Sequence, residues 1–233
     1  MTTAVILAGG FGTRLRNVVP DVPKPMAPVA GRPFLQHQMD YWIAQGVERF
    51  VLSVGYMRDA IQAHFGSAYR GVPVAYAIEE FPLGTGGGLL LAAKLLEDDA
   101  PFLLLNGDTF FEVDLAALRA FHAERRSDWT FSLFRSSEGG RYMGMDVAPD
   151  GRIRAFRSGQ SSVGALANGG VYLIDPTLLR RSPFLAGDKA SLEDEILPAL
   201  LGAGGAFHAV AFSGRFIDIG VPADYFRAGD VIY

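Results

Sequence analysis

The chain of 233 residues contains no cysteine, and this absence excludes disulfide bonds, thiolate nucleophiles and cysteine-ligated zinc. It has no cluster of lysine and arginine and a formal net charge of −4, so we expect no nucleic-acid partner. The four histidines are scattered without the spacing of metal ligands. The apolar segment at residues 4–8 is too short for a signal peptide or a membrane span, and no positively charged segment precedes it. We therefore expect a cytoplasmic protein with no membrane partner.

What the sequence does contain is enough apolar residues for a full core, 49% against 20% charged residues. In the first half, apolar segments of strand length alternate with segments of helical period, which is the pattern of βαβ units around a parallel sheet. Strands are expected at residues 5–8, 50–54, 74–78 and 102–105, and helices at 34–45, 58–65, 86–97 and 115–125. The sequence therefore predicts an α/β fold with a Rossmann-like, mostly parallel central sheet flanked by helices.

The second half has the strands and turns of a small antiparallel part. Strands are expected at residues 129–134, 145–147, 153–156, 171–174, 207–212 and 216–219. Ser191 to Asp194 is similar to a capping box that begins a helix to about residue 201, and a last helix is expected near Asp224. No long linker, repeat or low-complexity tract is visible, so we expect one domain over residues 1–233, with halves at 1–126 and 127–233.

A glycine-rich loop follows the first expected strand and carries two cations. Gly9, Gly10 and Gly12 let backbone N–H groups approach a polyphosphate without a Cβ atom in the way, and Arg14 and Lys24 supply charge that neutralises it. The prolines on either side of Lys24 fix the backbone there and favour an extended Lys24 whose ammonium is aimed at phosphate. The loop therefore predicts a triphosphate site.

Two commoner glycine loops do not match this segment. A dinucleotide-binding fingerprint requires a third glycine where this chain has Leu15, and a Walker A loop requires a Gly-Lys-Ser/Thr sequence that the chain does not contain. A plain strand-to-loop turn with incidental glycines is the alternative.

Acidic residues follow or interrupt apolar strands at what we expect to be one edge of the sheet. Asp108 and the pair Glu79 and Glu80 come after strand ends, where the ligand crevice of an open α/β sheet lies. Asp218 is a single charge in an apolar strand, which costs free energy unless a partner compensates it. Mg²⁺ prefers one or two carboxylates together with phosphate oxygens, so Mg²⁺ held by Asp108 and Asp218 is the expected cofactor. The alternative is a turn residue at Asp108 and a buried, hydrogen-bonded acid at Asp218.

Ordered motifs extend over nearly the whole chain: G-G-x-G-T-R-L, P-K-P, E-x-x-P-L-G-T-G-G, L-N-G-D, N-G-G and F-I-D-I-G. With these motifs the sequence resembles the sugar-1-phosphate nucleotidyltransferases, most of all those that use GTP and a heptose 1-phosphate to supply bacterial surface glycans. The resemblance implies a nucleotide-diphospho-sugar transferase fold with a nucleotide-binding first half and a sugar-phosphate-binding second half. It implies GTP and a sugar 1-phosphate as substrates, Arg14, Lys24, Asp108 and Asp218 as catalytic residues, and both aspartates as magnesium ligands.

The choice of base depends on the glutamate pair. Guanine presents its N1–H and N2–H₂ donors side by side, and an ionised carboxylate with two acceptor oxygens suits them. Because side chains alternate along a strand, only one of Glu79 and Glu80 is expected to face the base, and we favour Glu79 by its position. Two solvated glutamates are the alternative. Uracil and thymine are better matched by an amide, and a uridylyl- or thymidylyltransferase is the alternative for such a base. A nucleotide-sugar sensor that binds without turnover is a further alternative.

The resemblance also implies a larger set of ligand contacts. The expected nucleotide contacts are Leu7, Ala8, Gly9, Gly10, Gly12, Thr13, Arg14, Glu79, Glu80, Gly84, Thr85, Asn106 and Gly107, with residues 84–87 as a loop over the base. The expected sugar contacts are Tyr142, Gly144, Arg157, Asn168 and Gly169. Here the chain departs from the family pattern, because Met143 stands where glycine is usual and Ser158-Gly159 replaces a Glu-Lys pair that contacts the sugar and its phosphate. Arg157 is the expected substitute for the missing lysine. The sequence leaves the oligomeric state open, a homo-oligomer included.

Overall fold

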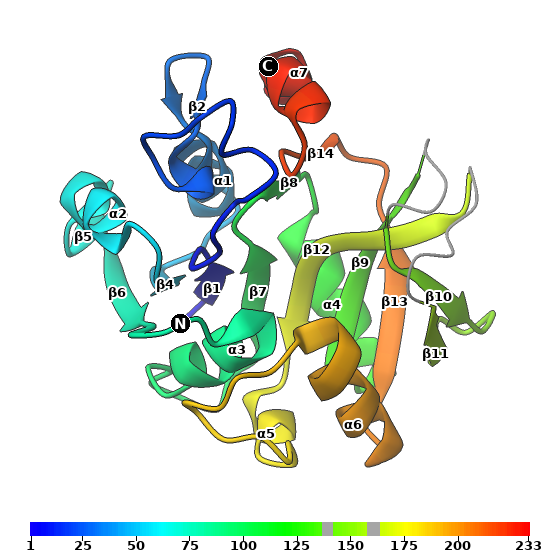
Figure 1. The fold of residues 1–233 in the computed structure, drawn as a ribbon. Coiled ribbons are helices and arrows are strands. Elements are labelled where there is room, and N and C mark those ends of the chain that lie inside the picture. The colour runs from blue at the N-terminus through cyan, green and yellow to red at the C-terminus, as the bar shows by residue number, and fades with distance from the viewer. Residues whose placement is uncertain (137–141, 158–163) are drawn as a thin grey trace.

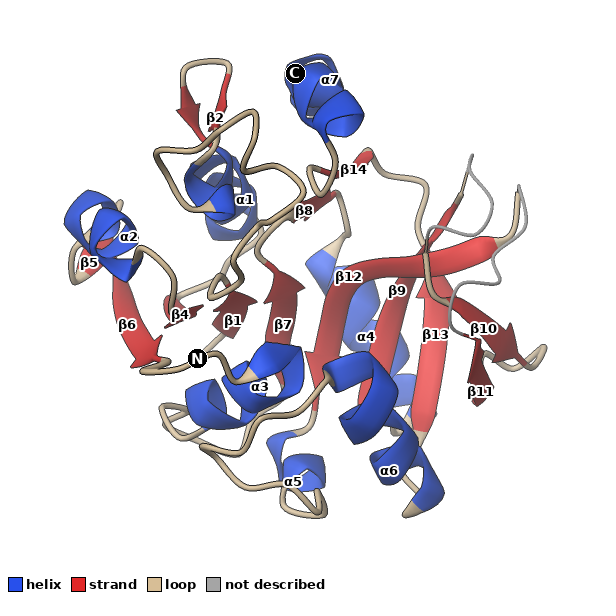
Figure 2. Ribbon diagram, viewed as in Figure 1, coloured by secondary structure: helices blue, strands red, loops and turns tan. Residues whose placement is uncertain are grey.

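The computed structural model describes residues 1–136, 142–157 and 164–233. A central sheet runs through the molecule, and helices cover both of its faces (Figure 1). Coloured by secondary structure, the same view separates the strands of this sheet from the helices around it (Figure 2). The chain thus has the layered arrangement that its alternating strand and helix patterns predict.

Four parallel strands form the centre of the sheet, in the spatial order β6 (Val72–Ile78), β4 (Arg49–Val54), β1 (Thr3–Leu7) and β7 (Phe102–Asn106). β1, β4 and β7 are buried along almost their whole length, as strands covered by helices on both faces must be. Because the strands are parallel, their carboxyl ends lie at one edge, and the loops that follow them meet there.

Strands from the second half extend the same sheet. β12 (Leu166–Ile174) pairs antiparallel with β7 and with β9 (Trp129–Arg135), and β13 (Phe207–Ala211) pairs parallel with β9. β9 and β13 therefore run in the direction of β7, and β12 is the reversed strand between β7 and β9. The predicted α/β fold with a mostly parallel central sheet is confirmed.

The other elements are helices on the faces of the sheet and short strands at its edges and ends. The helices are α1 (Phe34–Ala44), α2 (Arg58–Phe65), α3 (Gly84–Ala93), α4 (Leu115–Arg125), α5 (Pro176–Leu179), α6 (Leu197–Gly202) and α7 (Pro222–Ile232), with the short turns η1 (Lys24–Met26) and η2 (Leu192–Ile196). The short strands are β2 (Pro28–Val29), β3 (Arg32–Pro33), β5 (Ala68–Tyr69), β8 (Thr109–Phe111), β10 (Gly144–Val147), β11 (Ile153–Arg157) and β14 (Phe216–Asp218). The pair β10 with β11 is antiparallel, as predicted for the second half, and β14 pairs antiparallel with β8 of the first half.

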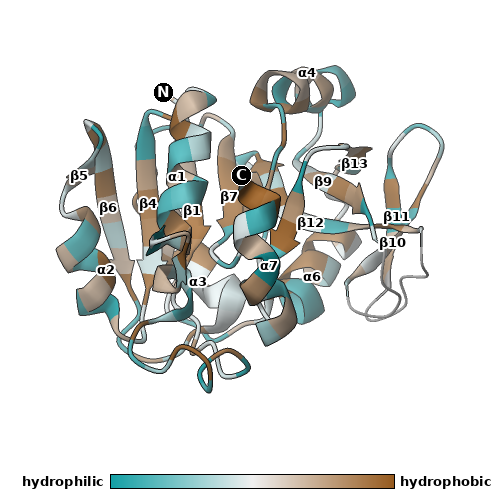
Figure 3. Ribbon diagram, turned by 90° about the horizontal axis from the view of Figure 1, so that it is seen from above, coloured by the Kyte–Doolittle hydropathy of each residue, from teal (hydrophilic) through white to brown (hydrophobic). Residues whose placement is uncertain are grey.

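Two layers of the hydrophobic core lie on the two faces of the sheet, and a third cluster packs α7 against β8 and β14. Ile6 and Leu105 pack with the apolar sides of α1, α2 and α4, whereas Val5 and Leu104 pack with α3 and α6. This division follows from the alternation of side chains along a strand. Seen from above, the hydrophobic colour lies on the interior strands, for example β7 and β12 (Figure 3). Such a core leaves little freedom to the strand ends that carry the loops of the site.

Local signals in the sequence set several element ends correctly. α4 begins at Leu115, as the pattern at residues 115–125 predicts, and Asp114 is its N-cap because the Asp114 carboxylate accepts a hydrogen bond from the backbone N–H of Ala117 at 3.0 Å. Gly46 follows the end of α1 with φ +92°, a conformation that favours glycine. Within the described residues, the helices are all too short or too polar to cross a membrane.

Candidate functional site

A cavity of about 640 Å³ opens beyond the carboxyl ends of β1, β6 and β7. Its walls come from the glycine loop after β1, the segment after β6, the first turn of α3, the end of β7 and the η2 turn. The residues that line it are Leu7, Ala8, Gly9, Gly10, Phe11, Gly12, Arg14, Lys24, Pro25, Glu79, Pro82, Gly84, Thr85, Asn106, Gly107, Asp108 and Glu193. The structure thus brings together, at the predicted edge of the sheet, segments that lie far apart in the sequence.

Most of the expected nucleotide contacts are in this cavity, and two are not. Thr13 is exposed on the glycine loop and does not line the cavity. Glu80 is also exposed, and its carboxylate pairs with the Arg58 guanidinium at 3.2 Å on the outer side of the strand end. Glu79 lines the cavity and Glu80 does not, although both border a smaller neighbouring cavity together with Arg58.

The glycines of the loop have a structural reason beyond contact with a phosphate. A Cβ atom on Gly9 would lie 2.3 Å from Oε1 of Glu79, so the absent side chain makes room for that carboxylate. Gly12 has φ +58°, and a Cβ atom there would lie 2.8 Å from Cβ of Lys24. Two glycines therefore allow an acid and a cation to enter the cavity wall, which the sequence motif alone does not reveal.

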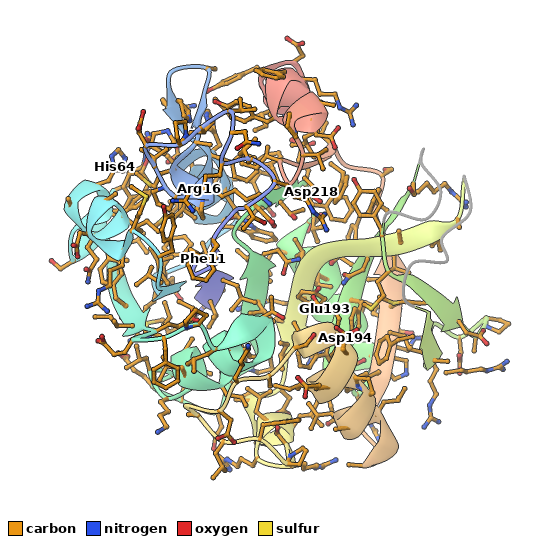
Figure 4. The ribbon with its side chains drawn as sticks, viewed as in Figure 1. Phe11, Arg16, His64, Glu193, Asp194 and Asp218 are labelled. Atoms are coloured by element: carbon orange, nitrogen blue, oxygen red, sulfur yellow. The ribbon has the colours of Figure 1, made fainter. Side chains whose placement is uncertain are left out.

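Asp108 contacts the Lys24 ammonium, and Asp218 lies in the same region of the structure. Lys24 Nζ lies 2.5 Å from Oδ2 of Asp108, with only 14% of the lysine side chain exposed. β14 pairs with β8 so that Asp218 stands opposite Thr109, the residue after Asp108. A Cβ atom on Gly220 would lie 2.8 Å from Oδ1 of Asp218 and 3.2 Å from Lys24 Nζ. Both acids, although 110 positions apart in the sequence numbering, thus border one small volume; Figure 4 shows Asp218 above the end of β7.

The backbone at Lys24 differs from the expected extended form. Lys24 begins η1, a 3₁₀ turn in which the N–H of Met26 donates to the carbonyl oxygen of Pro23 at 2.7 Å. The prediction of an extended Lys24 was therefore wrong. A proline inside the first turn of a helix is tolerated because that position needs no N–H partner, so Pro25 fits the turn instead of preventing it. The turn still presents the lysine to the cavity.

The donor set of this region is compatible with magnesium. Asp108 and Asp218 supply two carboxylates beside a cavity that can admit phosphates, and Mg²⁺ takes one or two carboxylates plus phosphate and water oxygens. Among the residues that the structure describes, no group of three or more histidines and acids could hold a metal ion by itself. The pair therefore suits a cation that arrives with a phosphate ligand rather than one enclosed by protein.

Glu79 is held in place by two protein donors. Its Oε1 atom accepts a hydrogen bond from Ser53 Oγ at 2.9 Å, and Oε2 accepts one from the backbone N–H of Leu83 at 3.1 Å. A Cβ atom on Gly88 would lie 3.0 Å from Oε1, so a second glycine also makes room for the carboxylate. Each carboxylate oxygen has a further lone pair, so a fixed Glu79 can still accept hydrogen bonds from a base.

The expected loop at residues 84–87 is instead the first turn of α3. A glycine-rich segment can form this helix because it lies against the backbone before η2: Cβ atoms on Gly84 and Gly87 would lie 2.6 Å from the carbonyl oxygen of Ala190 and 2.3 Å from that of Asp188. The N–H groups of Gly86 and Gly87 donate to the Ala190 carbonyl oxygen at 3.0 and 3.2 Å. Gly84 and Thr85 nevertheless line the cavity, as expected.

The expected sugar contacts lie outside this cavity. Asn168 donates from Nδ2 to the hydroxyl of Tyr172 at 2.7 Å and accepts at Oδ1 from the N–H of Gly170 at 3.2 Å, so it stabilises the bend in β12. Burial raises the pKa of Tyr172. Gly169 packs on Phe111, where a Cβ atom would lie 2.5 Å from the ring.

The remaining sugar contacts come from the β10 and β11 region. Tyr142 lines a second cavity of about 560 Å³ with Phe134 and Phe216, and Gly144 begins β10. Arg157 ends β11, but its side chain lies outside the described residues, as do Arg141, Ser158 and Gly159.

Glu193 and Phe11 are cavity residues that the sequence reasoning missed. Glu193 belongs to a segment whose Ser-x-x-Asp spacing indicated only a helix start. That spacing does not show which acid caps the helix and which one lines the cavity. Thr85 Oγ1 donates to Oε2 of Glu193 at 3.1 Å, and burial raises the pKa of this carboxyl. Phe11 occupies the variable position of the glycine loop, and its ring lies 5.4 Å from that of Tyr56 (Figure 4).

Comparisons with known proteins agree with this geometry. A family model described as nucleotidyl transferase matches residues 3–232. The chain is 38% identical to a D-glycero-alpha-D-manno-heptose 1-phosphate guanylyltransferase from Aneurinibacillus thermoaerophilus, covering 97% of this chain and 96% of the relative. It is 34% identical to a Campylobacter jejuni protein of the same name, covering 96% and 97%. The crystal structure of HddC from Yersinia pseudotuberculosis complexed with GMP-PN superimposes with a TM-score of 0.85 and 35% identity, covering 99% of both chains.

Proposed function

Because the chain belongs to the nucleotidyl transferase family, we propose that it transfers GMP from GTP to a heptose 1-phosphate and releases pyrophosphate. The observation that carries this proposal is the 38% identity with a heptose 1-phosphate guanylyltransferase, because the match extends over nearly the full length of both chains. The cavity supports this proposal independently, because the Glu79 carboxylate and the two cations Arg14 and Lys24 all line it. The product is a GDP-heptose.

The reaction needs no protein nucleophile. A phosphate oxygen of the sugar 1-phosphate attacks the α-phosphorus of GTP, and the bond from that phosphorus to the bridging oxygen of the β-phosphate breaks. Pyrophosphate leaves with the electron pair of that bond, in line with the incoming oxygen. The chain therefore contributes binding, orientation and charge, and each of these can be assigned to cavity residues.

Charge complementarity assigns the cations. The Arg14 guanidinium and the N–H groups of the glycine loop are suited to the β- and γ-phosphates, where negative charge increases as the bond breaks. Lys24, which touches Asp108 and lines the cavity, is suited to reduce the repulsion between the α-phosphate and the incoming sugar phosphate. Such preorganised contacts typically contribute about 2.7–4 kcal/mol each to the stability of the transition state.

Magnesium is part of the proposal. Asp108 and Asp218 would hold the ion, which when bound would act as a Lewis acid and neutralise charge on the two reacting phosphates. Support comes from the convergence of the two carboxylates beside a phosphate-sized cavity. A cytoplasmic location and the oligomeric state stay predictions.

Pyrophosphate release over a matrix of substrates tests the function. We expect turnover with GTP and D-glycero-D-manno-heptose 1-phosphate in the presence of Mg²⁺, and only slow release with UTP, dTTP, CTP or ATP. Mannose 1-phosphate and glucose 1-phosphate serve as comparison acceptors. A preference for UTP or dTTP would reassign the chain to uridylyl or thymidylyl transfer, and GTP binding without turnover on any acceptor would make it a nucleotide-sugar sensor.

Base recognition predicts the effect of a substitution at Glu79. Glu79→Gln replaces one acceptor oxygen by an amide that opposes the guanine donors, so kcat/KM for GTP should fall about 10- to 100-fold. Ser53 can turn its hydroxyl to accept from the new amide, so the fold is expected to survive. The loss should be smaller with inosine triphosphate, which lacks the exocyclic amine.

Glu80→Gln is the matched control, because that side chain pairs with Arg58 outside the cavity. Steady-state kinetics with both nucleotides measure the two variants. If Glu79→Gln leaves the preference for GTP unchanged while Glu80→Gln removes it, the role belongs to Glu80.

A further inference from the structure

The start of η2 leaves one of its three consecutive acids without a capping role. Ser191 is the N-cap, and its hydroxyl oxygen accepts from the backbone N–H of Asp194 at 3.1 Å. The Glu195 carboxylate accepts from the N–H of Ser191 at 2.7 Å, which completes the reciprocal bonding of the cap. Glu193 takes no part in the cap and points instead into the nucleotide cavity. Figure 4 shows Glu193 and Asp194 together at this helix start.

The position of Glu193 is fixed by the contact between α3 and η2. Thr85 Oγ1 donates to Glu193 Oε2 at 3.1 Å and accepts from the N–H of Leu192 at 2.9 Å. Leu192 and Ile196 are completely buried, so the turn cannot shift without opening the core. The carboxylate is therefore a rigid part of the cavity wall.

The negative charge of Glu193 limits which groups of a ligand can lie next to it in the cavity. The cavity is proposed to hold the phosphates of two substrates, and a carboxylate that faced phosphate would repel it. A carboxylate is an acceptor only, so its partners in the ligands must be donors. Guanine is already matched by Glu79. The remaining donors are hydroxyl groups, either those of the ribose or those of the acceptor sugar.

Burial makes this acid costly to keep. Removal from water raises the pKa of Glu193, which means that folding disfavours the ionised form at neutral pH. A glutamine of the same shape would avoid that cost. A charge retained against the stability of the fold is typical of a functional group.

We propose that Glu193 accepts hydrogen bonds from ring hydroxyl groups of the acceptor sugar and so holds the sugar 1-phosphate for attack. The inference depends on the proposed function, since it concerns the second substrate of that reaction. Glu193 belongs to the second half of the chain and interacts electrostatically with Asp108, where the two reacting phosphates are expected to meet.

The test is the kinetics of Glu193→Gln in the pyrophosphate assay. Hydrogen bonds to a charged group predict that kcat/KM for the sugar 1-phosphate falls about 10- to 100-fold, while KM for GTP changes less than about twofold. A structural role for the carboxylate would instead lower the melting temperature, which we expect to stay constant or rise. Asp194→Asn is the matched control, since this neighbouring acid bonds with Ser191 in the cap and does not line the cavity.

Deoxy substrates identify the bonded group. Monodeoxy analogues of the sugar 1-phosphate that lack a hydroxyl bound by Glu193 should be poor substrates of the wild-type enzyme and should lose nothing further in Glu193→Gln. If the variant instead raises KM for GTP and no longer discriminates 2′- or 3′-deoxyGTP, Glu193 binds the ribose and the proposal is overturned. An unchanged kcat/KM for the sugar 1-phosphate also overturns it. A wild-type protein without turnover on any acceptor contradicts the proposed function itself, which is a different result.

Discussion

Replacing Asp218 by asparagine is expected to lower kcat by about 10³-fold or more while GTP still binds with nearly its original affinity. The substitution removes one of two carboxylates that converge on a single position beside Lys24, so the charge on the reacting phosphates is no longer compensated. GTP affinity is spared because Asp218 is not among the residues that line the nucleotide cavity. The asparagine oxygen can still accept from the N–H of Gly220, a bond of 2.6 Å, so β14 keeps its turn.

Asp230→Asn is the matched control, because Asp230 is exposed on α7 and lies away from the cavity. Pyrophosphate release gives the rate of both variants, and calorimetric titration gives their affinity for GTP. An Asp218 variant with an undiminished rate would remove this residue from the mechanism. A matching loss in Asp230→Asn would mean that the effect comes from the fold and not from the site.

Lys24→Met is expected to lower kcat by about 10²- to 10³-fold, because the methionine keeps the length of the side chain and removes the charge that faces the phosphates. The same change removes the internal counter-ion of Asp108, which lies 2.5 Å from the ammonium. The nucleotide-free variant should therefore bind Mn²⁺, a paramagnetic substitute for Mg²⁺, more tightly than the wild-type protein. Electron paramagnetic resonance measures this affinity without any turnover.

Lys24→Arg is expected not to restore the rate. A planar guanidinium does not place its charge where the compact ammonium of Lys24 lies against Asp108. Arg16→Gln removes a positive charge from the same loop outside the cavity and should leave kcat within about twofold. Full activity in Lys24→Met, or equal losses in both neutralising variants, would contradict a specific role for Lys24.

Local patterns were sufficient for most of the fold. The strand at β1, the helix at α4 and the Asp114 cap depend on neighbours within a few residues, so apolar period and capping chemistry predict them. β8 was missed because a strand of three residues has no period to detect, and its partner β14 is more than 100 residues away. The small hairpin of β2 and β3 was missed because strands of two residues also have no period to detect.

Site residues were predictable where a local sequence motif indicates their function. They were not predictable where a contact between distant parts of the sequence places them in the site. The glycine loop, Glu79 and Asp108 were found because each follows a strand end, and Lys24 was found because prolines flank it. Glu193 was missed because its contact with Thr85 joins segments 108 positions apart, and the sequence around it indicates only a helix start. The conformation of Lys24 was misjudged because two prolines were read as preventing a helical turn, although Pro25 lies where a turn tolerates proline.

The close packing of α3 on the segment before η2 has a practical consequence for chimeric enzymes. Side chains at Gly84 or Gly87 would collide with backbone carbonyl groups of Ala190 and Asp188, at 2.6 and 2.3 Å, so neither surface can vary independently. Exchanging residues 83–88 between two relatives therefore requires transplanting residues 188–196 with them as a matched pair. A graft of either segment alone should yield insoluble protein before it yields a new specificity.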